Sequence, residues 1–355
     1  MNTDSNKLIS YIKIIAVILV FIICIGLLIF ESYTLFIVYD EGNAVMPSNF
    51  GNFEKVRNIL DDRPAKDEFS FAVIGDSRGY GALGYATFEE IMERLKDENL
   101  SFLVLLGDCV YKGTPYFHMY FKSEWSEELA TKYPTFYLPG NHDIGKDFTL
   151  SEFEDQYGPA IFSFEHQGNL FIFLNVLPEP YTIDGSIAFL ESMLPFDRSA
   201  YNKVFVFMHA PITVQSTHST KKVIDGDKLF PLFKDLGVDY VYAGDYHGYF
   251  REEHDGIDYI VTGGGGAKLI KAKFGQFYHA LIVTVRRDGG VFEEILQVAE
   301  ARSLEDSMEC LAMSEIYPFI KNNRILVIII NIAILLVLIF SYRIMYYCIR
   351  RFRNK

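Results

Sequence analysis

The sequence predicts a mixed α/β domain with a membrane-spanning helix on each side. Three observations lead to this interpretation. Short apolar runs alternate with amphipathic segments between residues 69 and 300, several of these runs end in turns rich in Asp or His, and a long apolar segment lies near each terminus. Half of the 355 residues are apolar, which is enough to build a large buried core.

The two terminal apolar segments have the length and composition of membrane spans. Ile14–Phe30 is an unbroken apolar run, and its apolar character resumes after Glu31 and continues to Val38. Ile325–Phe340 is the second such run. With flanking interfacial residues, each approaches the ~20 residues that a spanning helix needs. The first run is too long for a signal-peptide core and no small-x-small cleavage site follows it. A buried core helix is the alternative for the second run, which its basic tail disfavours.

Flanking basic residues predict how the spans are oriented. Lys7 and Lys13 precede the first span, and acidic residues follow it. The residues after the second span are also basic, whereas Lys321 and Arg324 before it weakly favour the opposite orientation. Because Lys and Arg gather on the cytoplasmic side of a membrane, we expect an integral two-pass membrane protein with both termini in the cytoplasm and an extracytoplasmic middle region.

These features divide the chain into seven segments. They are a cytoplasmic N-terminus (1–13), a transmembrane helix (14–38), a juxtamembrane linker leading into the domain (39–68), the globular domain (69–300), a linker (301–322), a second transmembrane helix (323–343) and a basic cytoplasmic tail (344–355). The formal net charge is −13. No basic stripe interrupts this acidic balance, so we expect no nucleic-acid partner.

The order of elements in the globular domain predicts a mixed sheet arrangement. The expected strands are Phe69–Ile74, Phe102–Leu106, Thr135–Leu138, Ile161–Phe164, Leu170–Leu174, Val204–Met208, Tyr240–Ala243, Asp258–Val261, His279–Val285 and Phe292–Val298. The expected helices are Thr87–Lys96, Tyr116–Lys132, Ser151–Tyr157, Ser186–Leu194 and Lys228–Leu236. The early β-α-β-α-β order favours parallel strands, and the late strands joined by glycine turns favour antiparallel pairing.

Five of the expected strands end in turns that carry potential metal ligands. The turns are Gly75-Asp76-Ser77-Arg78, Gly107-Asp108, Gly140-Asn141-His142-Asp143, His209-Ala210-Pro211 and Gly244-Asp245-Tyr246-His247. In open α/β sheets, functional sites form at the carboxyl ends of the strands. A single Gly-Asp turn commonly ends a strand, and a single histidine more often belongs to a core. Five such turns in one domain predict a metal centre.

In this order, the turns resemble the calcineurin-like metallophosphoesterase superfamily, whose motifs are Asp-x-His, Gly-Asp, Gly-Asn-His-(Asp/Glu), His and Gly-His-x-His. The resemblance covers residues 69–300, and the Gly-Asp and Gly-Asn-His-Asp motifs are intact. The glycine run Gly263–Gly266 also resembles members of the family. The resemblance implies a four-layer α/β/β/α sandwich, one or two divalent metal ions per chain, and hydrolysis of a phosphoester by a metal-bound hydroxide.

Two positions depart from the family pattern. Arg78 stands where the family has a metal-binding histidine, and Asp245 stands where it has the first histidine of the last motif. Arginine has no lone pair to donate and cannot be a ligand, whereas aspartate can. The two changes balance in charge, so we expect them to modify the properties of the site without destroying it. The resulting oxygen-rich donor set favours Mn²⁺, with Mg²⁺, iron and Zn²⁺ as alternatives.

The resemblance also implies a role for each matching residue. One metal would be held by Asp76, Asp108 and His247, and the other by Asp108, Asn141, His209 and Asp245, so that Asp108 bridges the two. His142, paired with Asp108, would protonate the leaving group. Arg78 would either contact a phosphate oxygen or form an ion pair with Asp245 or another acidic residue.

The predicted topology suggests the class of substrate. Members of this family with a span at each end of the domain include enzymes that act on phosphate-containing glycolipid anchors. We therefore expect a phosphodiesterase that hydrolyses a membrane-associated or extracytoplasmic phosphoester linked to lipid or glycan. A phosphomonoesterase of the same fold, and a catalytically decayed ligand-binding or receptor domain, are the alternatives.

Overall fold

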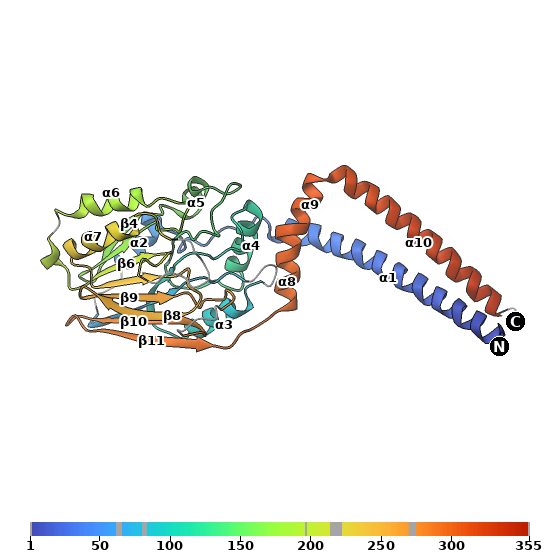
Figure 1. Cartoon of the computed structure of the whole chain (residues 1–355), viewed down its shortest axis with the longest axis horizontal. Helices are drawn as coiled ribbons and strands as arrows, with labels where there is room; N and C mark the ends of the chain where they lie inside the picture. The colour runs from blue at the N-terminus through green and yellow to red at the C-terminus, as the bar shows by residue number, and fades with distance from the viewer. Residues whose placement is uncertain are drawn as a thin grey trace. The chain divides into compact units, whose positions relative to one another are not determined.

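A computed structural model describes residues 2–61, 66–79, 84–195, 197–213, 222–269 and 275–353 (Figure 1). The chain forms two compact units. One is Ala44–Cys310, and the other combines Met1–Asn43 with Leu311–Lys355. The first unit holds every strand of the described chain and all of the predicted site residues.

The larger unit contains two sheets, which we name sheet A and sheet B. Sheet A has the order β11-β10-β1-β2-β3, and sheet B has the order β4-β5-β6-β7-β9-β8. The strands are β1 (Glu68–Ile74), β2 (Leu100–Leu105), β3 (Thr135–Tyr137), β4 (Phe162–His166), β5 (Asn169–Phe173), β6 (Val204–Met208), β7 (Tyr240–Ala243), β8 (Tyr249–His254), β9 (Ile257–Thr262), β10 (Tyr278–Arg286) and β11 (Val291–Val298). Parallel pairs occupy the centre of sheet B and one half of sheet A, and antiparallel pairs complete both sheets.

Alternating side chains explain how the layers pack. Phe171 and Phe205 point into the core that also holds Phe71 of sheet A, whereas their neighbours Ile172 and Val206 belong to a second core on the outer face of sheet B. Successive side chains of a strand face opposite sides of a sheet, so a strand buried on both faces is apolar throughout. The core between the sheets is largely built from phenylalanine rings, as the stacked pair of strand neighbours Phe171 and Phe205 illustrates.

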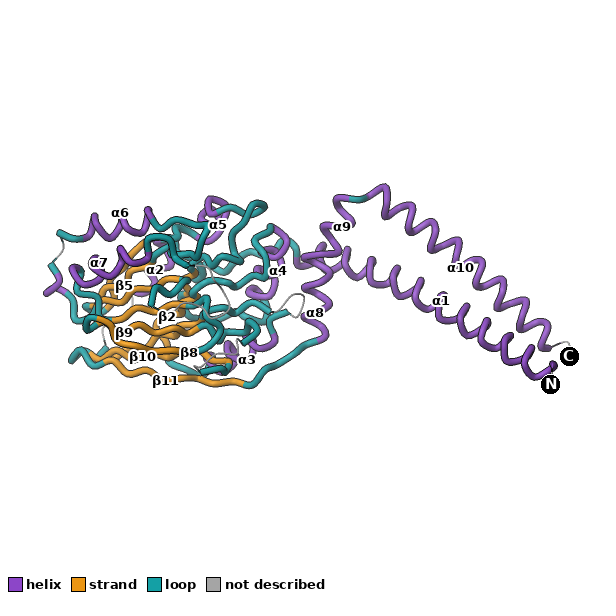
Figure 2. Tube along the Cα trace, in the orientation of Figure 1, coloured by secondary structure: helices purple, strands orange, loops and turns teal. Residues whose placement is uncertain are grey.

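The helices of the larger unit lie around its strands (Figure 2). They are α2 (Glu54–Asp61), α3 (Ala86–Leu95), α4 (Pro115–Ser126), α5 (Leu150–Tyr157), α6 (Asp184–Met193), α7 (Leu229–Asp235) and α8 (Leu304–Leu311). Leu190 of α6 and Phe233 of α7 complete the outer core of sheet B. Helix α3 lies against β10 and β11 of sheet A. The predicted four-layer mixed α/β sandwich is confirmed.

Every predicted strand and helix is present, with bounds that shift by a few residues except in α4. This helix ends at Ser126 and not at Lys132, because the chain turns back to bury Leu129, whose N–H donates to the carbonyl of Glu124 at 2.9 Å. Strand β8 and helices α2 and α8 were not predicted. β8 is a polar edge strand, half-exposed along its length, so it lacks the apolar pattern that reveals buried strands.

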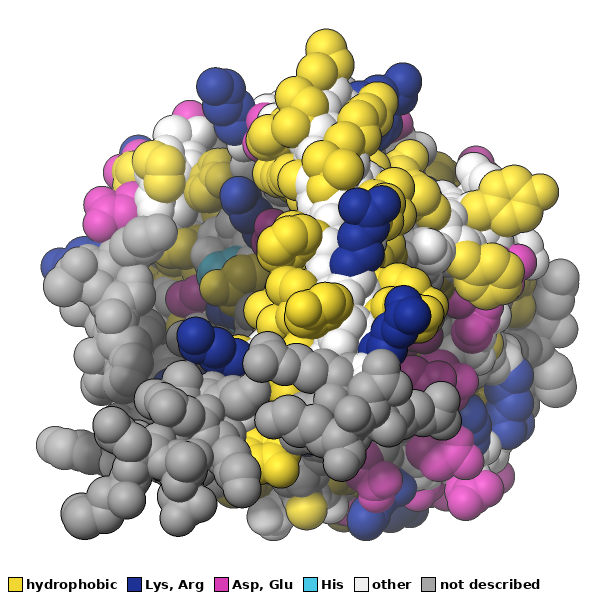
Figure 3. Space-filling view, turned by 90° about the vertical axis from the view of Figure 1, so that its right-hand side faces the viewer, with side chains coloured by type: hydrophobic (Ala, Val, Ile, Leu, Met, Phe, Trp, Pro, Cys, Tyr) yellow, Lys and Arg dark blue, Asp and Glu magenta, His cyan; other side chains and the backbone are white. Residues whose placement is uncertain are grey.

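The smaller unit is a pair of long helices with a short helical connection. Helix α1 spans Asn2–Glu41 and helix α10 spans Arg324–Arg353, joined to α8 by a π-helical turn (Ala312–Ile316) and by α9 (Tyr317–Asn322). Both long helices are long and apolar enough to cross a membrane. Apolar side chains dominate the visible surface of this pair (Figure 3). The amide of Asn331 on α10 donates to the carboxylate of Glu31 on α1 at 3.0 Å.

Candidate metal centre

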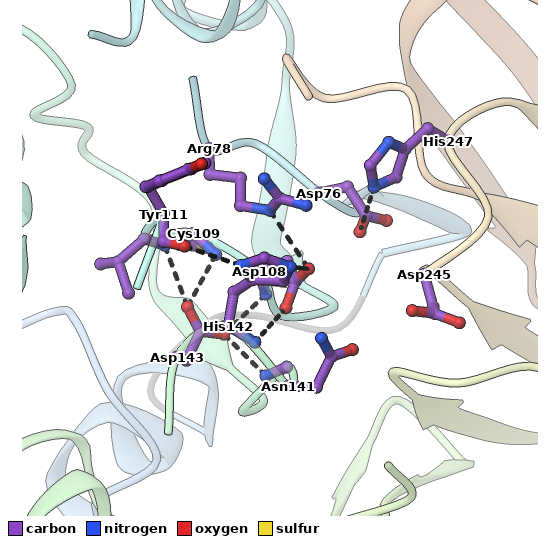
Figure 4. A network of polar contacts seen from close by, with 12 residues as sticks. Asp76, Arg78, Asp108, Cys109, Tyr111, Asn141, His142, Asp143, Asp245 and His247 are labelled. Carbon is purple, nitrogen blue, oxygen red and sulfur yellow. Dashed lines mark hydrogen bonds and ion pairs between the residues drawn. The ribbon is translucent and has the colours of Figure 1, made fainter. Parts of the chain in front are cut away.

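The predicted site residues meet at the carboxyl ends of five strands (Figure 4). Asp76 follows β1, Asp108 follows β2, and Asn141 with His142 follows β3, all in sheet A. From sheet B, His209 follows β6, and Asp245 with His247 follows β7. The sandwich brings together the carboxyl ends of strands from both sheets. Turns that are far apart in the sequence therefore form one site.

Three of the predicted ligands share an unusual backbone conformation. Asp76, Asp108 and Asp245 have φ angles of 57°, 54° and 58°. Positive φ is uncommon for residues other than glycine, although Asp tolerates it better than most. Such strain persists only where the surroundings enforce it, and it gathers at functional sites. Each strand thus ends in a turn that aims its aspartate in a fixed direction.

Glycines let these turns approach one another. A Cβ atom on Gly140 would lie 2.2 Å from Oδ1 of Asp108, and one on Gly263 would lie 2.6 Å from Oδ2 of Asp76. The run Gly263–Gly266 packs against the end of β1, where Gly265 N–H donates to the carbonyl of Gly75 at 2.8 Å. This close backbone approach explains the glycine run that the sequence shows.

One group of donors surrounds His209, and we call it the second metal position. Nδ1 of His209 donates to the carbonyl of Leu106 at 2.8 Å, so Nε2 is the nitrogen that can bind a metal ion once it has lost its proton. Nε2 lies 3.2 Å from Oδ1 of Asn141, 3.5 Å from Oδ1 of Asp108 and 3.7 Å from Oδ1 of Asp245. Side-chain spacings of this size are those of ligands around one cation. The four predicted ligands of this position converge.

The other group consists of Asp76, Asp108 and His247, and we call it the first metal position. Ligand atoms of all three lie within 4.8 Å of one another. Nδ1 of His247 donates to the carbonyl of Lys268 at 2.7 Å, and its Nε2 lies 3.5 Å from Oδ1 of Asp76. Such a backbone hydrogen bond fixes the ring orientation of a metal-binding histidine.

Asp76 tests whether these residues fit a metal ion. Its side chain is fully buried, and neither carboxylate oxygen accepts a hydrogen bond from any residue that the structure describes. A buried carboxylate without hydrogen bonds is costly unless a cation compensates it. The donor set and the buried carboxylate of Asp76 together fit a divalent metal.

Charge in the site points the same way. Burial would lower the pKa of His209, but Asp108, Asp76 and Asp245 raise the pKa to about 9. Burial likewise opposes ionisation of Asp108, yet His209, His142 and Arg78 hold the pKa of its carboxyl well below its usual range. A site that favours a protonated imidazole so strongly is electronegative and attracts cations.

Arg78 forms an ion pair inside the site. Its Nε lies 3.2 Å from Oδ2 of Asp108, its guanidinium carbon lies 5.8 Å from the centre of the Tyr111 ring, and the residue is 7% exposed. The sequence left an ion pair with Asp245 or another acidic residue as one alternative for Arg78. The partner in the structure is Asp108.

The sequence comparisons agree with this geometry. The family model described as calcineurin-like phosphoesterase matches residues 69–249. The chain belongs to this family. This protein is therefore a hydrolase that acts on phosphate esters. Members of the family depend on two metal ions.

The chain is similar to two curated proteins and to a solved structure. The phosphoesterase is 26% identical over 232 residues to the serine/threonine-protein phosphatase CPPED1 of Danio rerio, covering 59% of this chain and 74% of the relative. The Bos taurus protein of the same name is 26% identical over 242 residues, covering 59% and 72%. A dimetal phosphatase structure from Danio rerio is 11% identical, with a TM-score of 0.48 and coverage of 65% and 99%.

His142 of the phosphoesterase faces the edge of the site. Its Nδ1 donates to the carbonyl of Tyr111 at 2.7 Å, and its Nε2 lies 3.9 Å from Oδ2 of Asp108. Its backbone N–H donates to Oδ1 of Asp108 at 2.8 Å. The side chain is 35% exposed, so Nε2 is reachable from solvent.

Asp143 supports the turns of the site, in line with the interpretation of Asp143 as a turn residue or a residue behind the ligands. Its buried carboxylate accepts hydrogen bonds from the backbone N–H groups of Asp108, Cys109, Val110 and Gly140, at 2.6, 2.9, 3.0 and 2.6 Å. His118, which belongs to no sequence motif, contacts the carbonyl of Asp143 through Nε2 at 2.7 Å. The only sequence signal for Asp143 was its place in the Gly-Asn-His-Asp motif.

Proposed function

We propose that this phosphoesterase is a metal-dependent phosphodiesterase whose substrate is a membrane-associated or extracytoplasmic phosphoester. The observation that carries the metal dependence is the buried carboxylate of Asp76, which accepts no hydrogen bond from a described residue and lies beside His247 and Asp108. Metal ions held at the two positions would activate water and neutralise the charge that develops on the phosphoryl group. Because carboxylate and amide oxygens outnumber nitrogen donors, Mn²⁺ is the preferred ion.

His142 is positioned to protonate the leaving group. Its Nδ1–H is held by the carbonyl of Tyr111, so the proton that can be transferred lies on Nε2. As the bond from phosphorus to the leaving oxygen breaks, that proton moves to the oxygen and a water oxygen takes its place on phosphorus. Oδ2 of Asp108 lies 3.9 Å from Nε2 and stabilises the charged imidazolium before the proton is transferred.

Arg78 is positioned to bind the phosphate group. Its Nε is engaged by Asp108, and the two terminal nitrogens have no hydrogen bond to another residue that the structure describes. Guanidinium binds phosphate oxygens through paired, charge-assisted hydrogen bonds. The ion pair with Asp108 therefore orients Arg78 and leaves two nitrogens for the substrate.

The two apolar helices support a membrane-associated substrate. A domain anchored by α1 and α10 would meet phosphoesters at the membrane surface far more often than a free domain does. The basic residues outside the spans favour cytoplasmic termini and an extracytoplasmic domain. Protease treatment of sealed, right-side-out vesicles should then remove the domain and spare tags at both termini.

A phosphomonoesterase is the second candidate. The curated relatives are named serine/threonine-protein phosphatases, and a protein phosphatase acts on a monoester. The sites for mono- and diesters differ in whether a second organic group has room beside the phosphate.

The test uses the full chain in detergent or nanodiscs with added Mn²⁺. We expect hydrolysis of bis-nitrophenyl phosphate and of phospholipid diesters in vesicles to exceed hydrolysis of nitrophenyl phosphate. Asn141→Ala should abolish turnover and lower bound metal, whereas Asn202→Ala, at an exposed turn, should leave both unchanged. A clear preference for the monoester would replace the diesterase proposal, and absence of turnover on every ester would refute both.

A further inference from the structure

The two metal positions differ in the donors that surround them. The second position has four side-chain donors, two of them carboxylates. They are Nε2 of His209 and the oxygens of Asn141, Asp108 and Asp245 that lie around it. The first position has only Asp76, His247 and the shared Asp108. Asp245 adds a negative charge to the second position where the family motif has a neutral histidine. Ligand number and ligand charge both favour a cation at the second position.

Arg78 places a positive charge beside the first position. Its Nε contacts Oδ2 of Asp108, the carboxylate that the two positions share. That oxygen is therefore partly neutralised before any metal arrives. The other oxygen of this carboxylate, Oδ1, lies 3.5 Å from Nε2 of His209 at the second position. The guanidinium therefore contacts the oxygen that remains for the first position.

Arg78 cannot readily swing away from this place. Its backbone N–H donates to the carbonyl of Asp108 at 3.0 Å, and its guanidinium carbon lies 5.8 Å from the centre of the Tyr111 ring. With 7% of the residue exposed, the side chain has little room for another rotamer. The repulsion between Arg78 and a divalent ion at the first position is therefore built into the fold.

We infer that the second position fills first and tightly, and that Arg78 makes the first position a weak, exchangeable site completed by the phosphate group of the substrate. This inference rests on the proposed function, because it assigns the phosphate to the same site. A phosphate group brings oxygen ligands and negative charge, and it pairs with the free nitrogens of Arg78. Metal at the first position and phosphate should then strengthen one another's binding by the same factor.

The experiment counts metal ions in the absence of turnover. The full chain in detergent is stripped with a chelator and titrated with Mn²⁺, using calorimetry and the electron paramagnetic resonance of free and coupled Mn²⁺. We expect one tight ion and a second ion bound roughly 10–100-fold more weakly, the range that neighbouring groups impose on metal affinity. Inorganic phosphate should strengthen only the weaker step.

Two substitutions separate charge from ligand number. Arg78→Gln removes the charge without adding a strong donor and should strengthen the weaker step, but it should also abolish the effect of phosphate. Arg78→His restores a nitrogen donor and should give two tight ions. Arg94→Gln, on the exposed face of α3 and paired with Glu90, is the matched control and should behave as wild type.

Equal affinity for two ions in the wild-type chain would overturn the inference, whether or not the variants fold. So would an unchanged weaker step in correctly folded Arg78→Gln. Hydrolysis at saturating Mn²⁺ is measured separately. A chain that hydrolyses esters but binds two Mn²⁺ ions with equal affinity refutes only the inference that the two positions differ in affinity. A chain with unequal binding but no hydrolysis refutes the proposed function.

Discussion

The carboxylate of Asp143 accepts a hydrogen bond from the backbone N–H of Asp108 at 2.6 Å. The same carboxylate accepts the N–H of Gly140, also at 2.6 Å. One buried side chain therefore ties the turn after β2 to the turn after β3. These turns carry Asp108 and Asn141, so Asp143 sets the separation of two predicted ligands.

Asp143→Asn should weaken metal binding while leaving the fold intact. The amide keeps one acceptor oxygen, and its NH₂ group would face backbone donors that now lack a partner. We expect Mn²⁺ affinity to fall by roughly 10–100-fold. Stability should fall by about 1–3 kcal/mol, the cost of unsatisfied buried groups. Calorimetry measures the first effect and thermal unfolding of the stripped chain measures the second, with Asp147→Asn, an exposed residue, as the control.

The loss of kcat in His142→Ala should depend on the leaving group of the substrate. A positioned general acid contributes on the order of 10²–10⁴-fold. The loss of kcat should approach this range for an alkyl phosphodiester, whose leaving alkoxide needs a proton, and should be small for a nitrophenyl ester. His254→Ala, an exposed histidine on β8, should change neither rate. Equal losses on both substrates would contradict the role of His142.

Local patterns made the strands and the site predictable. Apolar runs that end in Gly-Asp or Asn-His mark buried strands, and parallel strands bring their carboxyl ends together, so Asp76 and His209 meet although they are far apart in sequence. The ion pairs and hydrogen bonds that individual side chains form within the site were not predictable. That Arg78 pairs with Asp108, and that Asp143 accepts four N–H groups, depend on how the loops pack in space. No local pattern encodes such contacts.

A partly buried acidic cluster should make stability depend on pH. Glu124 of α4 is 5% exposed and faces Glu89 of α3 together with Asp306 and Glu309 of α8. Burial and then the neighbouring carboxylates raise the pKa of Glu124 to about 9. Burial, followed by Asp306, raises the pKa of Glu89 to about 8. Both groups therefore keep their protons in the folded state at pH values where the unfolded chain has lost them.

The free energy of unfolding should consequently fall as pH rises. The contribution of these groups is fully present below their ordinary pKa of 4.5 and is lost as pH rises toward 8 and 9. Glu124→Gln cannot ionise, so its melting temperature should decline less than that of wild type between about pH 6 and about pH 9. Glu127→Gln, at an exposed position beside the end of α4, should follow the wild-type curve. Parallel curves for Glu124→Gln and wild type would rule out the effect.

The hydrogen bond from Asn331 to Glu31 should stabilise the pairing of α1 and α10. It joins the two helices within the apolar unit. Measured hydrogen bonds between membrane helices contribute about 0.6 kcal/mol on average and at most about 1.7 kcal/mol. Asn331→Leu removes the donor and should lower the unfolding free energy in detergent by an amount in this range. Glu31→Gln keeps a carbonyl oxygen that can accept the bond, so it should remain close to wild type. If Glu31→Gln loses as much stability as Asn331→Leu, the charge of Glu31 and not the hydrogen bond holds the helices together.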